Sequence, residues 1–204
     1  MSSTSEITDL SQKPADVEFV STRPQKLIEI VEPDPTWPAS FAIIERRVAD
    51  ALGDRLVSIQ HVGSTSVPGL PAKAIIDVDV VVADPTAEDT YVPALEAAGF
   101  QFLIREPGWY EHRFFGFTEP YANIHVFGPD CPELVRHRLF RDWLRTHEDD
   151  RRRYVDTKRQ AAAASRLAGE TVMEYNSRKQ SVIFDILRKA FKEHGYLNEL
   201  DSAE

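Results

Sequence analysis

Two aspartates one residue apart are the side chains of this sequence with the clearest chemical potential. Asp77 and Asp79 interrupt an apolar run over residues 75–82. Side chains alternate along a strand, so both carboxylates fall on one face while the valines face the other way. Buried carboxylates are costly unless they are paired or bind a metal. Because Mg²⁺ prefers carboxylate and phosphate oxygens, the pair predicts a site for a divalent metal ion.

A loop of small residues, GSTSVPGLPAK over 63–73, precedes this strand. Its first residues, Gly63 and Ser64, let backbone N–H groups and hydroxyls approach a phosphate closely, because no bulky Cβ blocks the anion. A metal ion on the two aspartates can bridge to a nucleoside triphosphate and orient an in-line attack. Each half of the pattern is common by itself. Together, with thirteen residues from Ser64 to Asp77, they predict a nucleotide site.

Other polar residues near these motifs are candidate phosphate ligands. Thr65 and Ser66 add hydroxyls to the turn, although turn propensity alone also selects such residues. Lys73 stands at the mouth of the strand, where it is either a point charge for a phosphate or a solvated loop lysine. In the last helix, Lys179 lies four residues after Tyr175 and therefore on the same face, from which it can close over a ligand.

A later strand, NIHVF over 123–127, carries His125. Its imidazole is a candidate metal ligand or base near neutral pH, and the alternative is a ring that packs behind the sheet against a backbone carbonyl. On the neighbouring strand, only one of His112 and Arg113 shares the face of His125 in a given register. Arg113 is the better phosphate ligand, because its guanidinium forks onto anionic oxygens.

Strands and helices alternate over the first two thirds of the chain, and these elements must position the motifs. Runs typical of strands lie over 27–31, 56–61, 74–83, 110–117 and 121–127. One helical pattern runs from Pro38 to Gly53, a second from Pro85 to Gly99, and three helices follow Pro129. We therefore predict an α/β protein with a disordered leader over 1–26, a core over 27–128, a helical part over 129–195 and a tail over 196–204.

Charge is distributed unevenly along the chain. There are 24 Lys and Arg against 33 Asp and Glu, for a net charge of −9. Residues 134–192 nevertheless carry 15 basic and 8 acidic side chains, a balance of +7, which leaves −16 for the rest. This basic segment can hold an anionic ligand, or its residues simply solvate helix faces and pair with the acidic half. The acidic total disfavours a dedicated nucleic-acid binder.

The composition also bounds the location of the protein. No apolar run approaches the ~18 residues that a membrane span needs, so no membrane partner is expected. The polar N-terminus lacks the apolar stretch of a secretory signal. A lone cysteine, Cys131, cannot form an internal disulfide and gives no sign of an oxidising compartment. We therefore expect a cytoplasmic protein.

The segment HVGSTSVPGLPAKAIIDVDV, over 61–80, resembles the signature block of the GrpB family. The stretches NIHVF and RHRLFRDWLR and the spacing from Tyr175 to Lys179 also resemble that family, so the similarity covers roughly 27–193. The family belongs to the group with the DNA polymerase β-like nucleotidyltransferase fold. The resemblance therefore implies a mixed sheet flanked by helices, followed here by a C-terminal three-helix segment.

In this resemblance, Gly63 and Ser64 match the phosphate-side turn, and Asp77 and Asp79 match the two metal-ligating acids, with Mg²⁺ or Mn²⁺ as the implied cofactor. Active members of the wider superfamily usually carry a third carboxylate on a later central strand. The candidate strand here offers His125 instead. A neutral imidazole adds no negative charge to a magnesium site, so either the chemistry is altered or the site only binds.

Three functions are compatible with these features. The leading one is binding of a nucleoside triphosphate with a divalent metal and transfer of a nucleotidyl group to an acceptor. The second is a non-catalytic module that binds a nucleotide or another small anion. The third is transfer of another group from a nucleotide-activated or RNA-linked substrate, given the basic helices. The sequence names neither the acceptor nor the oligomeric state.

Overall fold

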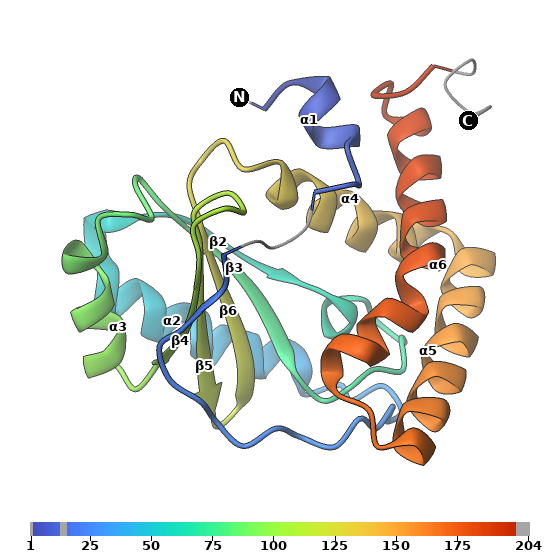
Figure 1. Ribbon diagram of the computed structural model, residues 1–204, viewed down its shortest axis with the longest axis horizontal. Coiled ribbons are helices and arrows are strands. Elements are labelled where there is room, and N and C mark those ends of the chain that lie inside the picture. The colour runs from blue at the N-terminus through green and yellow to red at the C-terminus, as the bar shows by residue number, and fades with distance from the viewer. Residues whose placement is uncertain (1, 13–15, 199–204) are drawn as a thin grey trace.

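The computed structural model describes residues 2–12 and 16–198 and is built around one six-stranded sheet (Figure 1). The strands are β1 (Glu18–Phe19), β2 (Leu56–Val62), β3 (Ile76–Val82), β4 (Gln101–Glu106), β5 (His112–Thr118) and β6 (Tyr121–Phe127). They are ordered β1-β4-β5-β6-β3-β2. Strands β3 and β6 run parallel, and the remaining neighbours run antiparallel. This confirms the predicted mixed sheet.

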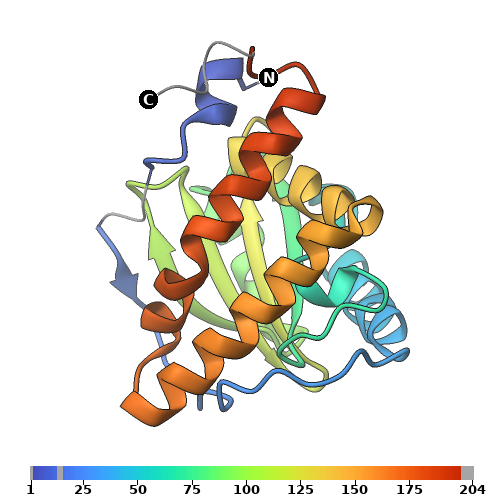
Figure 2. The same cartoon turned by 90° about the vertical axis from the view of Figure 1, so that its right-hand side faces the viewer.

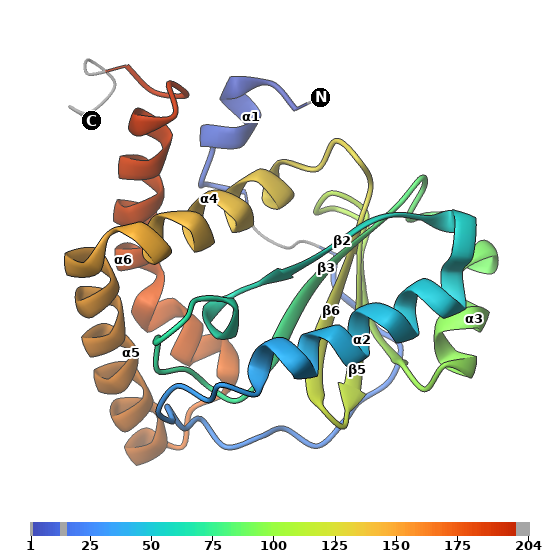
Figure 3. The same cartoon turned by 180° about the vertical axis from the view of Figure 1, so that it is seen from behind.

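Helices α2 (Trp37–Leu52) and α3 (Val92–Ala97) cover one face of the sheet (Figure 3). Helix α2 has Pro38 in its first turn, where the missing N–H is harmless, and it ends at Gly53. Its buried residues Ile44, Val48 and Leu52 follow at four-residue steps, which form one apolar stripe. That stripe and three valines of β3, Val78, Val80 and Val82, belong to one core, which gives this face its stability.

The other side of the sheet meets α4 (Pro132–Thr146), α5 (Glu148–Ala168) and α6 (Val172–Glu193), and α5 and α6 run side by side (Figure 2). Helix α5 ends at Gly169 in the left-handed conformation, and α6 begins with a capping box between Thr171 and Glu174. A second apolar cluster joins these helices to the loop residues Val67 and Leu70. The helices are thereby fixed against the loop that follows β2.

Two ordered elements lie within the expected leader. Helix α1 (Thr4–Thr8) buries Ile7, and its neighbouring carbonyl groups accept hydrogen bonds from the guanidinium of Arg136 on α4. Strand β1 pairs with β4. Both depend on contacts with distant parts of the chain, which a local pattern of polar residues does not reveal. By contrast, the strand expected over 27–31 is reduced to one bridge between Val31 and Ala72.

The C-terminal segment and three short turns lie outside the main helices and strands. Tyr196 and Leu197, at the start of the expected tail, pack against the helical cluster, and residues 199–204 lie outside the described residues. Short 3-10 turns, η1 (Gly53–Arg55), η2 (Ser64–Ser66) and η3 (Glu88–Thr90), connect the main elements. Across residues 2–12 and 16–198, no helix combines the length and apolar character needed to cross a membrane.

Candidate functional site

The parallel pairing of β3 with β6 sets the face of the candidate site. Asp77 lies opposite Asn123, and Asp79 lies opposite His125. Because side chains alternate along each strand, these four residues project from the same face, opposite the core under α2. The prediction that Asp77 and Asp79 share one face of a strand inside the sheet is therefore confirmed.

Gly63 brings the loop after β2 into direct contact with Asp77. Its φ of +66° lies in the region that favours glycine. A Cβ placed on Gly63 would lie 2.5 Å from Oδ2 of Asp77 and 3.0 Å from its Cβ. A glycine is therefore required on both conformational and steric grounds, and the turn and the first aspartate form one unit.

Asp77 is half-buried and sits among cationic and amide groups. The side-chain amide of Asn123 donates to its Oδ1 at 2.7 Å. The guanidinium of Arg23, from the N-terminal segment, donates in turn to the amide oxygen of Asn123. Burial raises the pKa of Asp77, and the Asn123 hydrogen bond and the charges of Lys73 and Lys179 oppose that rise.

Asp79 is only 2% exposed, and its partner is His137 on α4. The Nδ1 atom of His137 lies 3.0 and 2.9 Å from the two carboxylate oxygens. Burial opposes a charge on this ring, but the charge of Asp79 and its hydrogen bond prevail and raise the pKa of His137 to about 9. The ring of His137 is therefore an imidazolium at neutral pH.

A buried lysine of α5 approaches the Gly63 turn. Lys158 is 2% exposed, and its ammonium donates to Ser64 Oγ at 3.1 Å and to the carbonyl of Pro71 at 2.6 Å. It also lies 4.5 Å from the centre of the Tyr154 ring. Burial drives the pKa of Lys158 well below its ordinary value. This amino group lies beside the turn that is predicted to bind phosphate.

Lys73 and Lys179 flank the same corner of the site. Each ammonium lies 5.1 Å from the centre of the Tyr175 ring. Burial lowers the pKa of both lysines to about 8, assisted at Lys73 by the charge of Lys179 and opposed at both by Asp77. Both predicted phosphate ligands therefore lie near the first aspartate.

The hydroxyl groups of Thr65 and Ser66 are engaged inside the loop. Thr65 Oγ1 donates to the carbonyl of Ile75 at 3.1 Å and lies 3.0 Å from Nε2 of His61. Ser66 Oγ donates to the carbonyl of Gly63 at 2.6 Å. Both residues are buried. In this arrangement they shape the turn, and Ser64 is the residue of the three whose hydroxyl meets a lysine.

His125 lies on the site face, half-buried beside Asp79. Its Nδ1 is 3.1 Å from Nε2 of His112, whose own Nδ1 is 2.5 Å from Oε2 of Glu106. Burial lowers the pKa of both imidazoles to about 3, so both rings are neutral near pH 7. The alternative prediction, a ring behind the sheet bonded to a backbone carbonyl, does not match this position.

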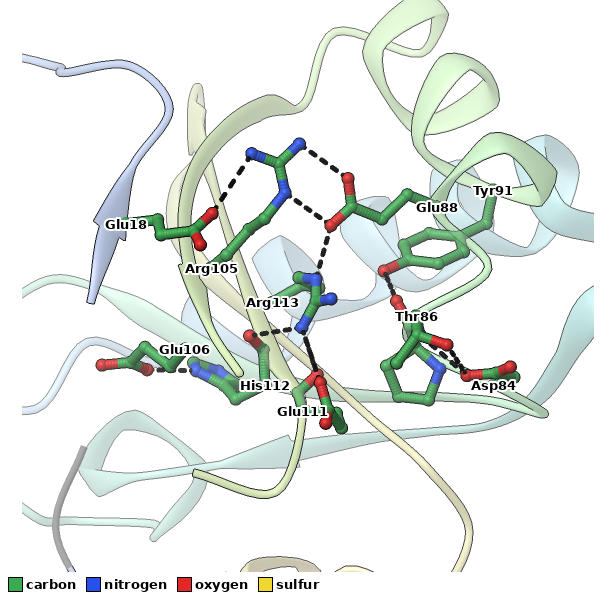
Figure 4. A network of polar contacts seen from close by, with 11 residues as sticks. Glu18, Asp84, Thr86, Glu88, Tyr91, Arg105, Glu106, Glu111, His112 and Arg113 are labelled. Atoms are coloured by element: carbon green, nitrogen blue, oxygen red, sulfur yellow. Dashed lines mark hydrogen bonds and ion pairs between the residues drawn. The ribbon is translucent and has the colours of Figure 1, made fainter. Parts of the chain in front are cut away.

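Arg113 lies on the opposite face from His125, and its predicted place at the phosphate site needs correction. The register pairs Phe114 with His125, so His112 shares their face and Arg113 points toward η3. There its Nε donates to Glu88 at 2.6 Å, next to Arg105 on the same carboxylate (Figure 4). Arg113 is thus a buried structural partner of Glu88. The affinity of a guanidinium for phosphate oxygens favoured Arg113 over His112 as the residue on the site face, and the register shows that His112 lies there.

The sequence patterns did not predict three residues of the site, Asn123, His137 and Glu106. Asn123 is two residues from His125, so strand alternation alone places both on one face. His137 and Glu106 carried no comparable local signal, because their partners Asp79 and His112 lie on other elements. Contacts of this kind depend on how α4 and β4 pack on the sheet.

The donor set does not fit a resident Mg²⁺ or Mn²⁺ ion in this arrangement. Within the described part of the chain, no three His, Cys, Asp or Glu side chains are grouped as ligands for one ion. The oxygens of Asp79 already face the imidazolium of His137, and Oδ1 of Asp77 accepts from Asn123. A divalent ion would require His137 to leave Asp79.

Two surface hollows lie away from these residues. One of about 420 Å³ lies between α2 and α3, lined by Ile43, Arg46, Arg47, Asp50 and alanines. Another of about 290 Å³ is lined by Tyr110, Cys131 and their neighbours. Neither is lined by Asp77 or Asp79, so the polar cluster on β3 and β6 remains the candidate site on chemical grounds.

Known proteins share this framework. The family model described as GrpB protein matches residues 27–189. The chain is 42% identical to the UPF0157 protein BH1888 of Halalkalibacterium halodurans, over 80% of this chain and 82% of that protein. It is 30% identical to a dephospho-CoA kinase of Mycolicibacterium paratuberculosis, over 80% of this chain and 46% of the kinase.

A solved structure matches as well. The crystal structure of the conserved protein GrpB from Enterococcus faecalis superposes with a TM-score of 0.69 at 25% identity, covering 82% of this chain and 99% of that one. The residues that the family model matches contain the Gly63 turn, both aspartates and the lysines around them. Because the family model spans most of the sequence, the chain belongs to the GrpB family.

Proposed function

We propose that this protein binds a phosphate-bearing ligand, a nucleotide in the leading case, against the Gly63 turn. The observation that carries the proposal is a group of three lysines, Lys73, Lys158 and Lys179, around Ser64 and Asp77. Among the described residues, none of the three lies within salt-bridge distance of a carboxylate. A polyphosphate would supply the missing negative charge.

Burial makes this arrangement informative. An ammonium group removed from water without a counter-ion is unfavourable, so buried lysines usually pair with an acid or meet a ligand. Across the residues that the structure describes, Lys158 donates hydrogen bonds only to a hydroxyl and a carbonyl, and the Tyr154 ring is its aromatic neighbour. A phosphate beside Ser64 would stabilise its charged form, and charge-assisted hydrogen bonds of this kind are the strong ones. The lysines reach this corner from three separate segments, the loop before β3 and helices α5 and α6.

Nucleotidyl transfer is the second candidate, favoured by Asp77 and Asp79 on one face of β3. In this version a divalent ion would arrive bound to the nucleotide, and Asp77 and Asp79 would hold it only if His137 moved away from Asp79. Binding alone needs no such change. The dephospho-CoA kinase that matches this chain is about twice as long as the matched part, so its name supports neither candidate directly.

Calorimetric titration of ATP, with and without Mg²⁺, tests the binding proposal. We expect ATP to bind without Mg²⁺ and to bind about tenfold more weakly to Lys179→Gln, the loss of one charged hydrogen bond. Inorganic triphosphate should show the same dependence on Lys179, because the lysines recognise phosphate. Affinity should fall as the pH rises through about 8, where Lys73 and Lys179 lose their charge.

The matched control is Lys192→Gln, which removes an exposed lysine near the end of the same helix. It should bind ATP like the wild-type protein. Equal affinity of Lys179→Gln and wild type, or no binding of ATP and triphosphate at all, would refute the proposed phosphate site. If Mg²⁺ strengthens ATP binding and Asp79→Asn abolishes that gain, the transfer candidate is favoured.

A further inference from the structure

A carboxylate and two imidazoles form a chain that leads from β4 to the candidate site. Glu106 lies directly opposite His112 in the β4–β5 register, and His112 approaches His125 on β6. The contacts are 2.5 Å from Glu106 Oε2 to His112 Nδ1 and 3.1 Å from His112 Nε2 to His125 Nδ1. All three side chains are mostly buried, so water does not compete freely for these contacts.

Aromatic side chains surround His112, the middle residue of this hydrogen-bonded series. His112 is 3% exposed and stacks on Phe127, with ring centres 4.6 Å apart. Trp109 presents its ring at 82° to His112, 5.1 Å away. A buried ring packed against two aromatic side chains cannot turn over easily, so its two nitrogens keep their separate partners. The direction of the hydrogen bonds is then set at the carboxylate end.

Burial raises the pKa of Glu106, and its carboxyl group is ionised only above that raised value. Once ionised it can only accept a hydrogen bond, so Nδ1 of His112 then carries the proton. In a neutral imidazole the other nitrogen, Nε2, is then an acceptor. His125 must donate to it from Nδ1. Nε2 of His125 is consequently left without a proton, and it points away from His112 because the two ring nitrogens diverge.

We propose that Glu106 and His112 are positioning residues that hold His125 with a lone pair on Nε2, as a proton acceptor for a hydroxyl group or water at the candidate site. The location rests on the proposed function, whereas the proton arrangement does not. A buried acid that fixes the tautomer of a catalytic histidine is a known device, here extended by a second imidazole. His125 would then recognise a donor group of the ligand and would not donate to its phosphates.

In the transfer candidate this acceptor has a defined task. The oxygen of an acceptor hydroxyl forms a bond to the α-phosphorus, and its proton passes to Nε2 of His125. The bond from phosphorus to the bridging oxygen breaks, and pyrophosphate leaves with the electron pair. His125 can pass its Nδ1 proton to His112, and His112 can pass its own to Glu106, so no imidazolium remains buried.

Nitrogen-15 NMR of the histidine rings, in the ligand-free full chain at about pH 8, tests the proposal. That pH lies well above the ordinary pKa of a carboxyl group and favours the ionised form of Glu106 despite the rise in its pKa on burial. We expect His112 and His125 both to show a protonated Nδ1 and an unprotonated Nε2. In Glu106→Ala, His112 loses its acceptor and both rings should change mainly to the Nε2-protonated form. The control Glu111→Ala removes a neighbouring acid that faces Arg113 and should leave both rings unchanged.

Either of two results would overturn the proposal. One is a wild-type His125 that carries its proton on Nε2, and the other is a pair of tautomers that stays unchanged in folded Glu106→Ala. If Glu106→Ala does not fold, Glu106→Asp is measured instead, and its shorter carboxylate should loosen the preference at both rings together. None of these measurements requires ATP, so a failed phosphate site and a failed histidine chain are separate outcomes.

Discussion

The two faces of the same central strands have opposite character. On the α2 side, Val78, Val80 and Ile124 are fully buried in one apolar core. On the α4–α6 side, the alternate residues are Asp77, Asp79 and His125, each in polar contact. The first face gains stability from apolar burial, whereas the second holds charges in place. Substitutions one residue apart should therefore separate stability from ligand binding.

The largest expected effect comes from a neighbouring pair on β6. Ile124→Ala removes a fully buried side chain from the core and should lower the free energy of unfolding by about 3 kcal/mol. Asn123→Ala should cost about 1 kcal/mol through the lost hydrogen bond to Asp77. Urea denaturation gives both values. Ligand affinity should change in the opposite order, and an Ile124 variant that weakens ATP binding more than the Asn123 variant would contradict this division.

The next effect is a dependence of stability on pH at the charged face. The pKa of His137 is raised from 6.5 to about 9, so its stabilising contribution is complete below about 6.5 and is lost as pH rises through about 9. After allowance for partial exposure, we expect a contribution on the order of 2 kcal/mol. Unfolding of wild type and His137→Asn at several pH values measures it. A difference between them that is constant from pH 6 to about 10 would refute the charged pair.

The smallest effect tests the contact between the Gly63 turn and Asp77. Gly63 and Gly69 have similar positive φ values, +66° and +73°, but a Cβ at Gly69 meets nothing within 4 Å. Gly63→Ala and Gly69→Ala therefore share the backbone strain, and only the first displaces Asp77. We expect Gly63→Ala to be less stable than Gly69→Ala by about 1 kcal/mol, measured by thermal unfolding. Equal losses of stability in the two variants would show that Asp77 moves aside for the added methyl group at no cost in free energy.

Much of the fold was predictable from local patterns, because β3 and α2 carry clear periodicities and stop signals. Alternation placed Asp77 and Asp79 on one face without any knowledge of the tertiary structure. The choice between His112 and Arg113 failed because it depends on the register of β5 with β6, which the side-chain chemistry does not determine. The roles of His137 and Glu106 and the order within the leader were not predicted for a related reason, since each depends on a partner far away in the sequence.

The position of a bound triphosphate tests the central claim most directly. Crystals soaked with a non-hydrolysable ATP analogue and Mg²⁺ should show phosphate oxygens at Ser64, Lys158 and Lys179, on the face of the sheet that carries Asp77. A metal bridging the phosphates to Asp79, with His137 displaced, would add support for nucleotidyl transfer. Phosphates in the hollow between α2 and α3, or at Arg113, with the three lysines untouched, would contradict the account.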